Sequence, residues 1–204
     1  PGWGSLVGNS LDRGCGYTYG SYRDHFDSHC GMEVVLPNGE LIRTGMGALP
    51  GAKTWAEFRH GFGPSVDGLF SQGNLGIVTK MGFHLMPQPD AYMSAMAFVP
   101  RREDLIPLVE IVNSLEHGGA IGQPRYASPL QSLLGEPDFK KSINSRAGMT
   151  NDELNRLAKD RELASWQVEL QIYGAPAVTE ASWAAARSKI SAAIPGARFE
   201  VLQR

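Results

Sequence analysis

Glycine is the feature of this sequence that most constrains its fold. The chain contains 24 glycines, against about 14 expected at an ordinary usage of roughly 7%. Their distribution is uneven, because 17 lie in residues 1–89 and seven in residues 90–204. Glycine accepts positive φ and lets backbones approach closely, so tight turns are expected in the first part. We therefore predict two regions of different structure, with a domain boundary near residue 90.

The first region carries a β-hairpin signal. Asn38-Gly39 lies between two β-prone runs, and this dipeptide favours a tight hairpin because both residues tolerate positive φ. Pro87 and Pro89 then interrupt the pattern, since proline cannot continue a ladder of strand hydrogen bonds. The predicted strands cover residues 32–36, 41–44 and 76–81, the last continuing towards 83–86.

The second region is predicted to alternate strands and helices. Apolar residues recur at helical spacing in two stretches, and Thr150 with Glu153 forms a capping box before another helix. The predicted elements are a strand over 91–99, a helix over 103–116, a loop with a short helix, a helix after Thr150, a strand over 166–173, a helix over 181–193 and a strand over 199–202. This order indicates an α+β layer with the helices on one face of a sheet.

Charge, hydropathy and cysteine content exclude several classes of protein. Lys and Arg total 19 and Asp and Glu total 21, so a broadly basic nucleic-acid binder is excluded. No apolar run reaches the roughly 18 residues that span a membrane. Cys15 and Cys30 could form a disulfide only with Cα atoms within about 7 Å, and we expect two free, buried thiols. The chain starts at Pro1 and stops within a predicted strand, so we expect a fragment of a longer protein.

His25 and His29 are the candidate metal ligands. Histidines four residues apart could place two imidazoles on one face of a helix. However, Gly31 and a predicted strand follow at once, and no further ligand cluster is present. A polar turn with hydrogen-bonded histidines is the better interpretation, so no metal is expected.

Two glycine-rich stretches allow a functional and a structural interpretation. Gly2-x-Gly4-x-x-x-Gly8 is similar to a dinucleotide-binding fingerprint but has one residue too many and lacks the βαβ context. Small residues there let backbone amides approach a flat or anionic ligand, or they simply form tight turns. The second stretch, Phe70–Thr79, also has two interpretations. Its backbone N–H and C=O groups could form hydrogen bonds with the edge of a heterocycle, or the stretch could simply be a turn before a core strand.

Several stretches resemble the flavoprotein family of vanillyl-alcohol oxidase, eugenol oxidase and 4-cresol dehydrogenase (p-cresol methylhydroxylase). They occur in order over residues 1–89, whereas residues 90–204 match more loosely. The matching stretches are Gly8-Asn9 with Asp12-Arg13-Gly14-x-Gly16-Tyr17-Thr18, Asp24-His25-Phe26, His29 to Leu36, Arg43 to Leu49, Gly61 to Gly82, and Leu85-Met86-Pro87. The resemblance implies an α+β fold: the second half of a PCMH-type FAD-binding domain over 1–89, then the first part of a ferredoxin-like substrate cap domain over 90–204.

The resemblance also implies FAD as the cofactor. In the family, the opening glycine loop lies along the flavin, and the strand after the second glycine-rich stretch contacts the adenine end through its backbone. Carried over to this chain, the cofactor-binding residues are Gly4, Ser5, Gly8, Asn9, Gly16, Tyr17, Gly76, Ile77 and Val78. No catalytic residue is assigned, because the family's phenolate-binding and flavin-tethering residues lie outside the matching stretches.

The reaction that the resemblance implies is oxidation of a 4-alkylphenol. A hydride passes from the benzylic carbon of the bound phenolate to flavin N5 and leaves a quinone methide. The implied partners are a small phenolic substrate, a c-type cytochrome or another electron acceptor, and further copies of the full-length chain in a homo-oligomer. The opening Pro1–Ser5 is more similar to the dehydrogenase branch than to the oxidases. The alternatives are an FAD-linked oxidase of another alcohol or sugar, and a non-catalytic α+β binding module. The fragment by itself is expected to be inactive.

Overall fold

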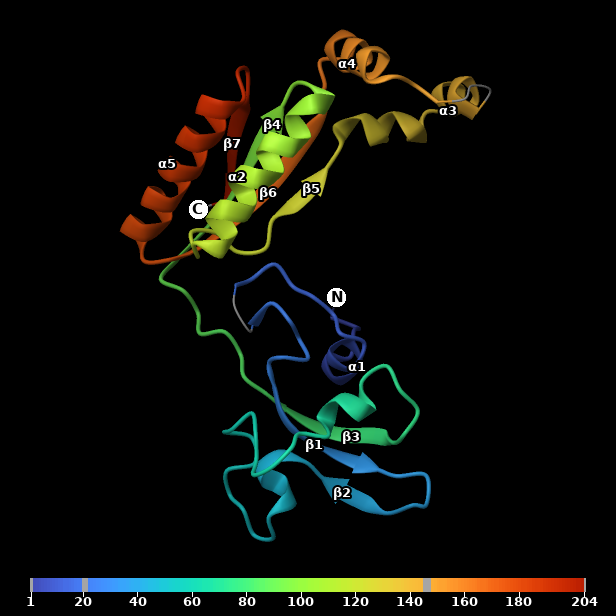
Figure 1. Ribbon diagram of the computed structural model, residues 1–204, viewed down its shortest axis with the longest axis vertical. Helices are drawn as coiled ribbons and strands as arrows, with labels where there is room; N and C mark the ends of the chain where they lie inside the picture. Colours follow the sequence, from blue (N-terminus) through green and yellow to red (C-terminus); the bar gives the residue numbers. More distant parts are fainter. Residues whose placement is uncertain (1, 20–21, 145–147, 204) are drawn as a thin grey trace. The chain divides into compact units, whose positions relative to one another are not determined.

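The computed structural model describes residues 2–19, 22–144 and 148–203. The chain divides into two compact units, Pro1–Gln88 and Pro89–Arg204, hereafter the first and the second unit. The first unit contains, in chain order, α1 (Leu6–Leu11), β1 (His29–Val35), β2 (Leu41–Arg43), the 3-10 turns η2 (Gly45–Ala48) and η3 (Asp67–Phe70), and β3 (Ile77–Phe83) (Figure 1).

The sheet of the first unit has the antiparallel order β2-β1-β3. Val34 of β1 lies opposite Ile42 of β2, and Gly39 in the connecting turn has a φ of 85°, so the predicted hairpin is confirmed. The third strand ends at Phe83 and does not reach residue 86. One face of the sheet carries a small core, whose buried members are Phe26, Met32, Val34 and Phe70.

Helix α1 was not predicted from the sequence. It begins after Ser5, whose extended backbone and side chain form an N-cap, with Gly8 N–H donating to Ser5 Oγ at 3.0 Å. The fully buried Ser10 then donates its hydroxyl to the carbonyl oxygen of His25 at 2.9 Å. These capping and long-range contacts stabilise a short helix although it contains Gly8, and glycine disfavours helix.

The second unit is built on a four-stranded antiparallel sheet of order β5-β6-β4-β7. Helices α2 and α5 pack together against one face of this sheet (Figure 1). Their apolar side chains, such as Leu108 and Ile190, join Val99 and Leu170 of the strands in one buried core. The elements are β4 (Ala91–Val99), η4 (Arg102–Asp104), α2 (Leu105–His117), β5 (Arg125–Ala127), η5 (Pro129–Gly135), α3 (Pro137–Asn144), α4 (Asn151–Asp160), β6 (Trp166–Gly174), α5 (Pro176–Ala193) and β7 (Arg198–Gln203).

Local signals located most of these elements, with two differences. The capping box of α4 is confirmed, with Glu153 N–H donating to Thr150 Oγ1 and Thr150 N–H donating to Glu153 Oε2. Helix α5 begins five residues earlier than predicted, with Pro176 in its first turn, a position that suits proline. The three-residue strand β5 was missed, because it is defined by pairing with β6 and has no periodicity of its own.

None of the helices in the described part of the chain is long and apolar enough to cross a membrane.

Candidate functional site

A pocket of about 540 Å³ opens beside the start of α1, and we call it the α1 pocket. Four predicted cofactor residues share it, because its lining consists of Gly4, Ser5, Leu6, Gly8, Asn9 and Asp12. Gly8 lines the pocket, and a Cβ atom placed on it would make ordinary contact with Ser5 at 3.4 Å, so a larger side chain there would take up space at the pocket wall. Leu6 is 72% exposed and adds an apolar surface. The backbone of the first helical turn is therefore accessible to a flat, partly apolar ligand.

The α1 pocket is held against the loop that leads into β3. Arg13 Nη2 donates to Ser71 Oγ at 3.1 Å, and Gln72 N–H donates to the carbonyl oxygen of Leu11 at 2.9 Å. The side-chain amide of Gln72 also donates to the carbonyl oxygen of Asp12 at 3.1 Å. The two glycine-rich stretches that the sequence singled out thus lie side by side. Sequence reasoning missed these bonds, which join residues about 60 positions apart.

Gly16 and Tyr17 occupy a different position from the α1 pocket. Gly16 packs on the imidazole of His25, since a Cβ there would lie 3.1 Å from His25 Nε2. The preceding Gly14 lies under Asn9, where a Cβ would come within 1.6 Å of Asn9 Oδ1. Tyr17 is half exposed. Close packing is therefore sufficient to explain the glycines at positions 14 and 16.

Gly76, Ile77 and Val78 lie at the start of an edge strand. A Cβ on Gly76 would come within 2.5 Å of Val34 Cγ1, so this glycine is required for packing of the chain onto β1. Val78 packs on the core of the first unit, whereas Ile77 is 72% exposed. Among the described strands β3 pairs only with β1, so its outer backbone groups are open to a further partner.

A buried ion pair holds η3 against the start of β1. His29 Nε2 lies 2.6 Å from Asp67 Oδ2, and the other ring nitrogen contacts the carbonyl oxygen of Phe26. Burial by itself raises the pKa of Asp67, but hydrogen bonds from His29 and Thr44, with the nearby charges of His29 and His60, bring it below its usual value. Both side chains are almost fully buried.

This pairing leaves His29 no ring nitrogen for a metal ion. The interpretation of the histidines as hydrogen-bonded groups near a turn is confirmed for His29, since β1 begins at this residue and no helix joins it to His25. Within the described residues no group of three or more His, Cys, Asp or Glu side chains could hold a metal.

The two cysteines are free and differ in their surroundings. Cys30 is buried, which raises the pKa of its thiol, and its Sγ donates to the carbonyl oxygen of Ala56 at 3.2 Å. Cys15 is exposed, so the expectation of two buried thiols was wrong for this residue. Cys15 lies in an isolated bridge with Asp24 and not in a packed sheet, which leaves its side chain accessible to solvent.

The sequence and the fold of this chain are similar to those of known proteins. No family model matches the chain. The chain is 37% identical over 179 residues to the flavoprotein subunit of 4-cresol dehydrogenase [hydroxylating] from Pseudomonas putida, an alignment that covers 87% of this chain and 34% of that protein. The structure aligns with p-cresol methylhydroxylase with substrate bound at a TM-score of 0.81 and 33% identity, covering 97% of this chain and 38% of that one. In sequence and in structure, this chain is similar to flavoproteins of the vanillyl-alcohol oxidase and 4-cresol dehydrogenase family.

A second solved structure supports the same family. The isoeugenol complex of 4-ethylphenol oxidase from Gulosibacter chungangensis aligns at a TM-score of 0.82 and 35% identity, covering 98% of this chain and 38% of that chain. The predicted α+β fold of the family is therefore confirmed. The chain spans little more than a third of the length of these relatives.

Proposed function

We propose that this chain is part of an FAD-dependent oxidoreductase that oxidises 4-alkylphenols. Residues 1–89 form the C-terminal part of its PCMH-type FAD-binding domain, and residues 90–204 form the N-terminal part of its substrate cap domain. The observation that carries this proposal is the 37% identity, over 87% of this chain, to a 4-cresol dehydrogenase flavoprotein subunit.

The α1 pocket is suited to a flavin. Its small residues and accessible backbone fit a flat ring system, and Leu6 supplies an apolar contact. In this proposal Gly4, Ser5, Gly8 and Asn9 line the ring system. The open edge of β3 at Ile77 and Val78 contacts the adenine end through its backbone. Gly16 and Tyr17 complete the contacts from the neighbouring loop.

When bound, the cofactor supplies the acceptor, flavin N5, for a hydride from the benzylic carbon of the phenolate. The phenolate becomes a quinone methide on losing that hydride, and addition of water gives the alcohol. The residues of this chain bind and orient the ring system. Donors that stabilise the phenolate come from the remainder of the protein.

The proposed partners are inferred from the same relatives. The Pseudomonas putida relative is a flavoprotein subunit, which supports a second subunit in that protein. We propose that a c-type cytochrome or another acceptor removes the electrons here, and that the full-length protein forms a homo-oligomer.

The visible spectrum of the full-length protein tests this function. Anaerobic addition of 4-ethylphenol is expected to bleach the flavin absorbance, whereas the 204-residue chain by itself is expected neither to hold FAD tightly nor to turn over. A colourless protein would contradict flavin binding and favour a non-catalytic module. A flavin bleached by other alcohols or by sugars, and not by 4-alkylphenols, would instead identify the related oxidase.

Gly8→Val is expected to weaken FAD loading of the full-length protein about 10- to 100-fold, because the branched side chain enters the α1 pocket. Loading is measured as flavin absorbance per protein after reconstitution of the apoprotein. Gly8→Ala is the graded control, because its Cβ makes only ordinary contact with Ser5 while alanine favours the helix. Equal loading of the valine variant and the unmodified protein would remove Gly8 from the site.

A further inference from the structure

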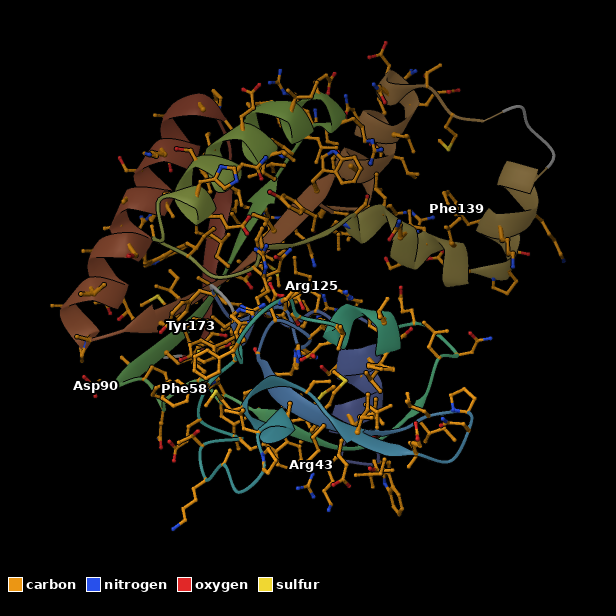
Figure 2. All side chains as sticks on the ribbon, turned by 60° about the horizontal axis from the view of Figure 1, so that its bottom comes forward. Arg43, Phe58, Asp90, Arg125, Phe139 and Tyr173 are labelled. Atoms are coloured by element: carbon orange, nitrogen blue, oxygen red, sulfur yellow. The ribbon has the colours of Figure 1, made fainter. Side chains whose placement is uncertain are left out.

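The second unit contains a cavity whose lining includes none of the residues assigned to the cofactor. It has a volume of about 200 Å³ and lies where η5, α3 and α4 meet the start of β6; we call it the cap cavity. Its walls are mostly apolar, and Phe139 of α3 is labelled in Figure 2. The apolar lining residues are Leu130, Leu134, Phe139, Leu154, Leu157 and Trp166. The polar lining residues are Arg102, Ser128 and Gln131.

Arg102 lines this cavity and forms no ion pair with any carboxylate of the described residues. Its guanidinium stacks on the Trp166 ring at 3.8 Å, and among the described residues its one hydrogen bond is a long one, 3.4 Å from Nη1 to Ser128 Oγ. Nε is buried and has no acceptor in the described part of the protein. The neighbouring carboxylates are engaged elsewhere, since Asp104 pairs with Arg101 at 2.7 Å and Glu103 accepts from the Asn155 amide at 3.0 Å.

The surrounding structure fixes Arg102 in this position. Its N–H donates to Asn155 Oδ1 at 2.8 Å, and its carbonyl oxygen accepts from Trp166 Nε1 at 3.0 Å. Ser128 in turn donates its hydroxyl to the carbonyl oxygen of Ser165 at 2.8 Å. Residues of α4 and β6 therefore hold the backbone of Arg102 before any ligand arrives, which reduces the entropy that binding would cost.

We propose that the cap cavity binds a small amphipathic carboxylate. The carboxylate accepts hydrogen bonds from the guanidinium of Arg102, and the apolar body lies against the leucines and Phe139. The planar guanidinium matches a carboxylate in geometry and charge. A mostly apolar cavity with a few convergent polar groups is typical of small-molecule sites. This proposal does not rest on the proposed oxidation.

The proposal is tested by titrating the full-length protein with octanoate and measuring the heat of binding by isothermal titration calorimetry. We expect saturable binding at one site. Octanamide has the same apolar body without the charge and is expected to bind about 10- to 100-fold more weakly. Arg102→Gln is expected to weaken octanoate binding by a similar factor. Arg156→Gln removes a charge from an exposed position of α4 and is the matched control, expected to bind as the unmodified chain does.

A second variant keeps the test decisive if Arg102→Gln fails to fold. Leu134 lines the cavity but is 48% exposed, so Leu134→Asp places a like charge beside the ligand with little cost to folding. It is expected to weaken octanoate binding at least about tenfold, with circular dichroism confirming the fold. The proposal is overturned by absence of saturable binding, by equal affinity for octanoate and octanamide, or by unchanged affinity in a folded Arg102→Gln or Leu134→Asp variant.

Discussion

Asp67→Ala is expected to lower the stability of the first unit by about 3–5 kcal/mol, because it leaves His29 buried without its charged partner. His29 lies 2.6 Å from the carboxylate, and both side chains are almost fully buried. Hydrogen exchange of the β1 amides measures this loss in the first unit alone. Asp67→Asn is expected to cost less, since its amide oxygen can still accept from the imidazole. Asp160→Asn, at an exposed position, is the control. A normal exchange pattern in Asp67→Ala would show that the pair does not hold η3 to β1.

The same pair predicts how stability depends on pH. The pKa of Asp67 is lower in the folded protein than in the unfolded chain, where it is about 3.9. Its contribution is therefore fully present above the unfolded pKa and is lost as pH falls through the folded pKa. Denaturant midpoints between about pH 2 and pH 6 should show a steeper acid loss in the unmodified protein than in Asp67→Ala. Parallel curves would contradict the lowered pKa.

Gly76→Ala is expected to destabilise the first unit by about 1–3 kcal/mol even without cofactor, and Gly76→Val by more. The new Cβ would lie 2.5 Å from Val34 Cγ1 and 3.1 Å from the carbonyl oxygen of Val35, in the centre of the sheet. Val34 is fully buried and β-branched, so it cannot easily move away. Denaturation of the apoprotein measures the effect.

Gly68→Ala is the matched control for this substitution. A Cβ at that position would meet only Arg13, at 3.9 Å, and the residue is exposed. We expect its stability to stay within about 0.5 kcal/mol of the unmodified protein. If Gly76→Ala left the apoprotein equally stable and impaired only FAD loading, Gly76 would be a cofactor contact and not a packing residue.

Elements with a strong local pattern could be predicted from the sequence. Asn38-Gly39 indicated the hairpin, and the Thr150–Glu153 capping box indicated the start of α4. Helix α1 could not be predicted in this way, because Gly8 disfavours helix and the stabilising Ser5 cap acts together with a distant bond from Ser10. Strand β5 exists through its pairing with β6 and has no signal of its own.

The candidate site, too, could be predicted only in part from the sequence. Glycine content, turn dipeptides and family motifs identified two stretches near residues 4–9 and 70–78. Glycine can be recognised from the sequence alone, and its lack of a Cβ atom lets another group approach the backbone closely. Only the tertiary structure decided that Arg13 and Gln72 join these stretches, and that Asp67 pairs with His29. The physical reason is that these bonds join residues 38 to 60 positions apart, and no local periodicity constrains such pairs.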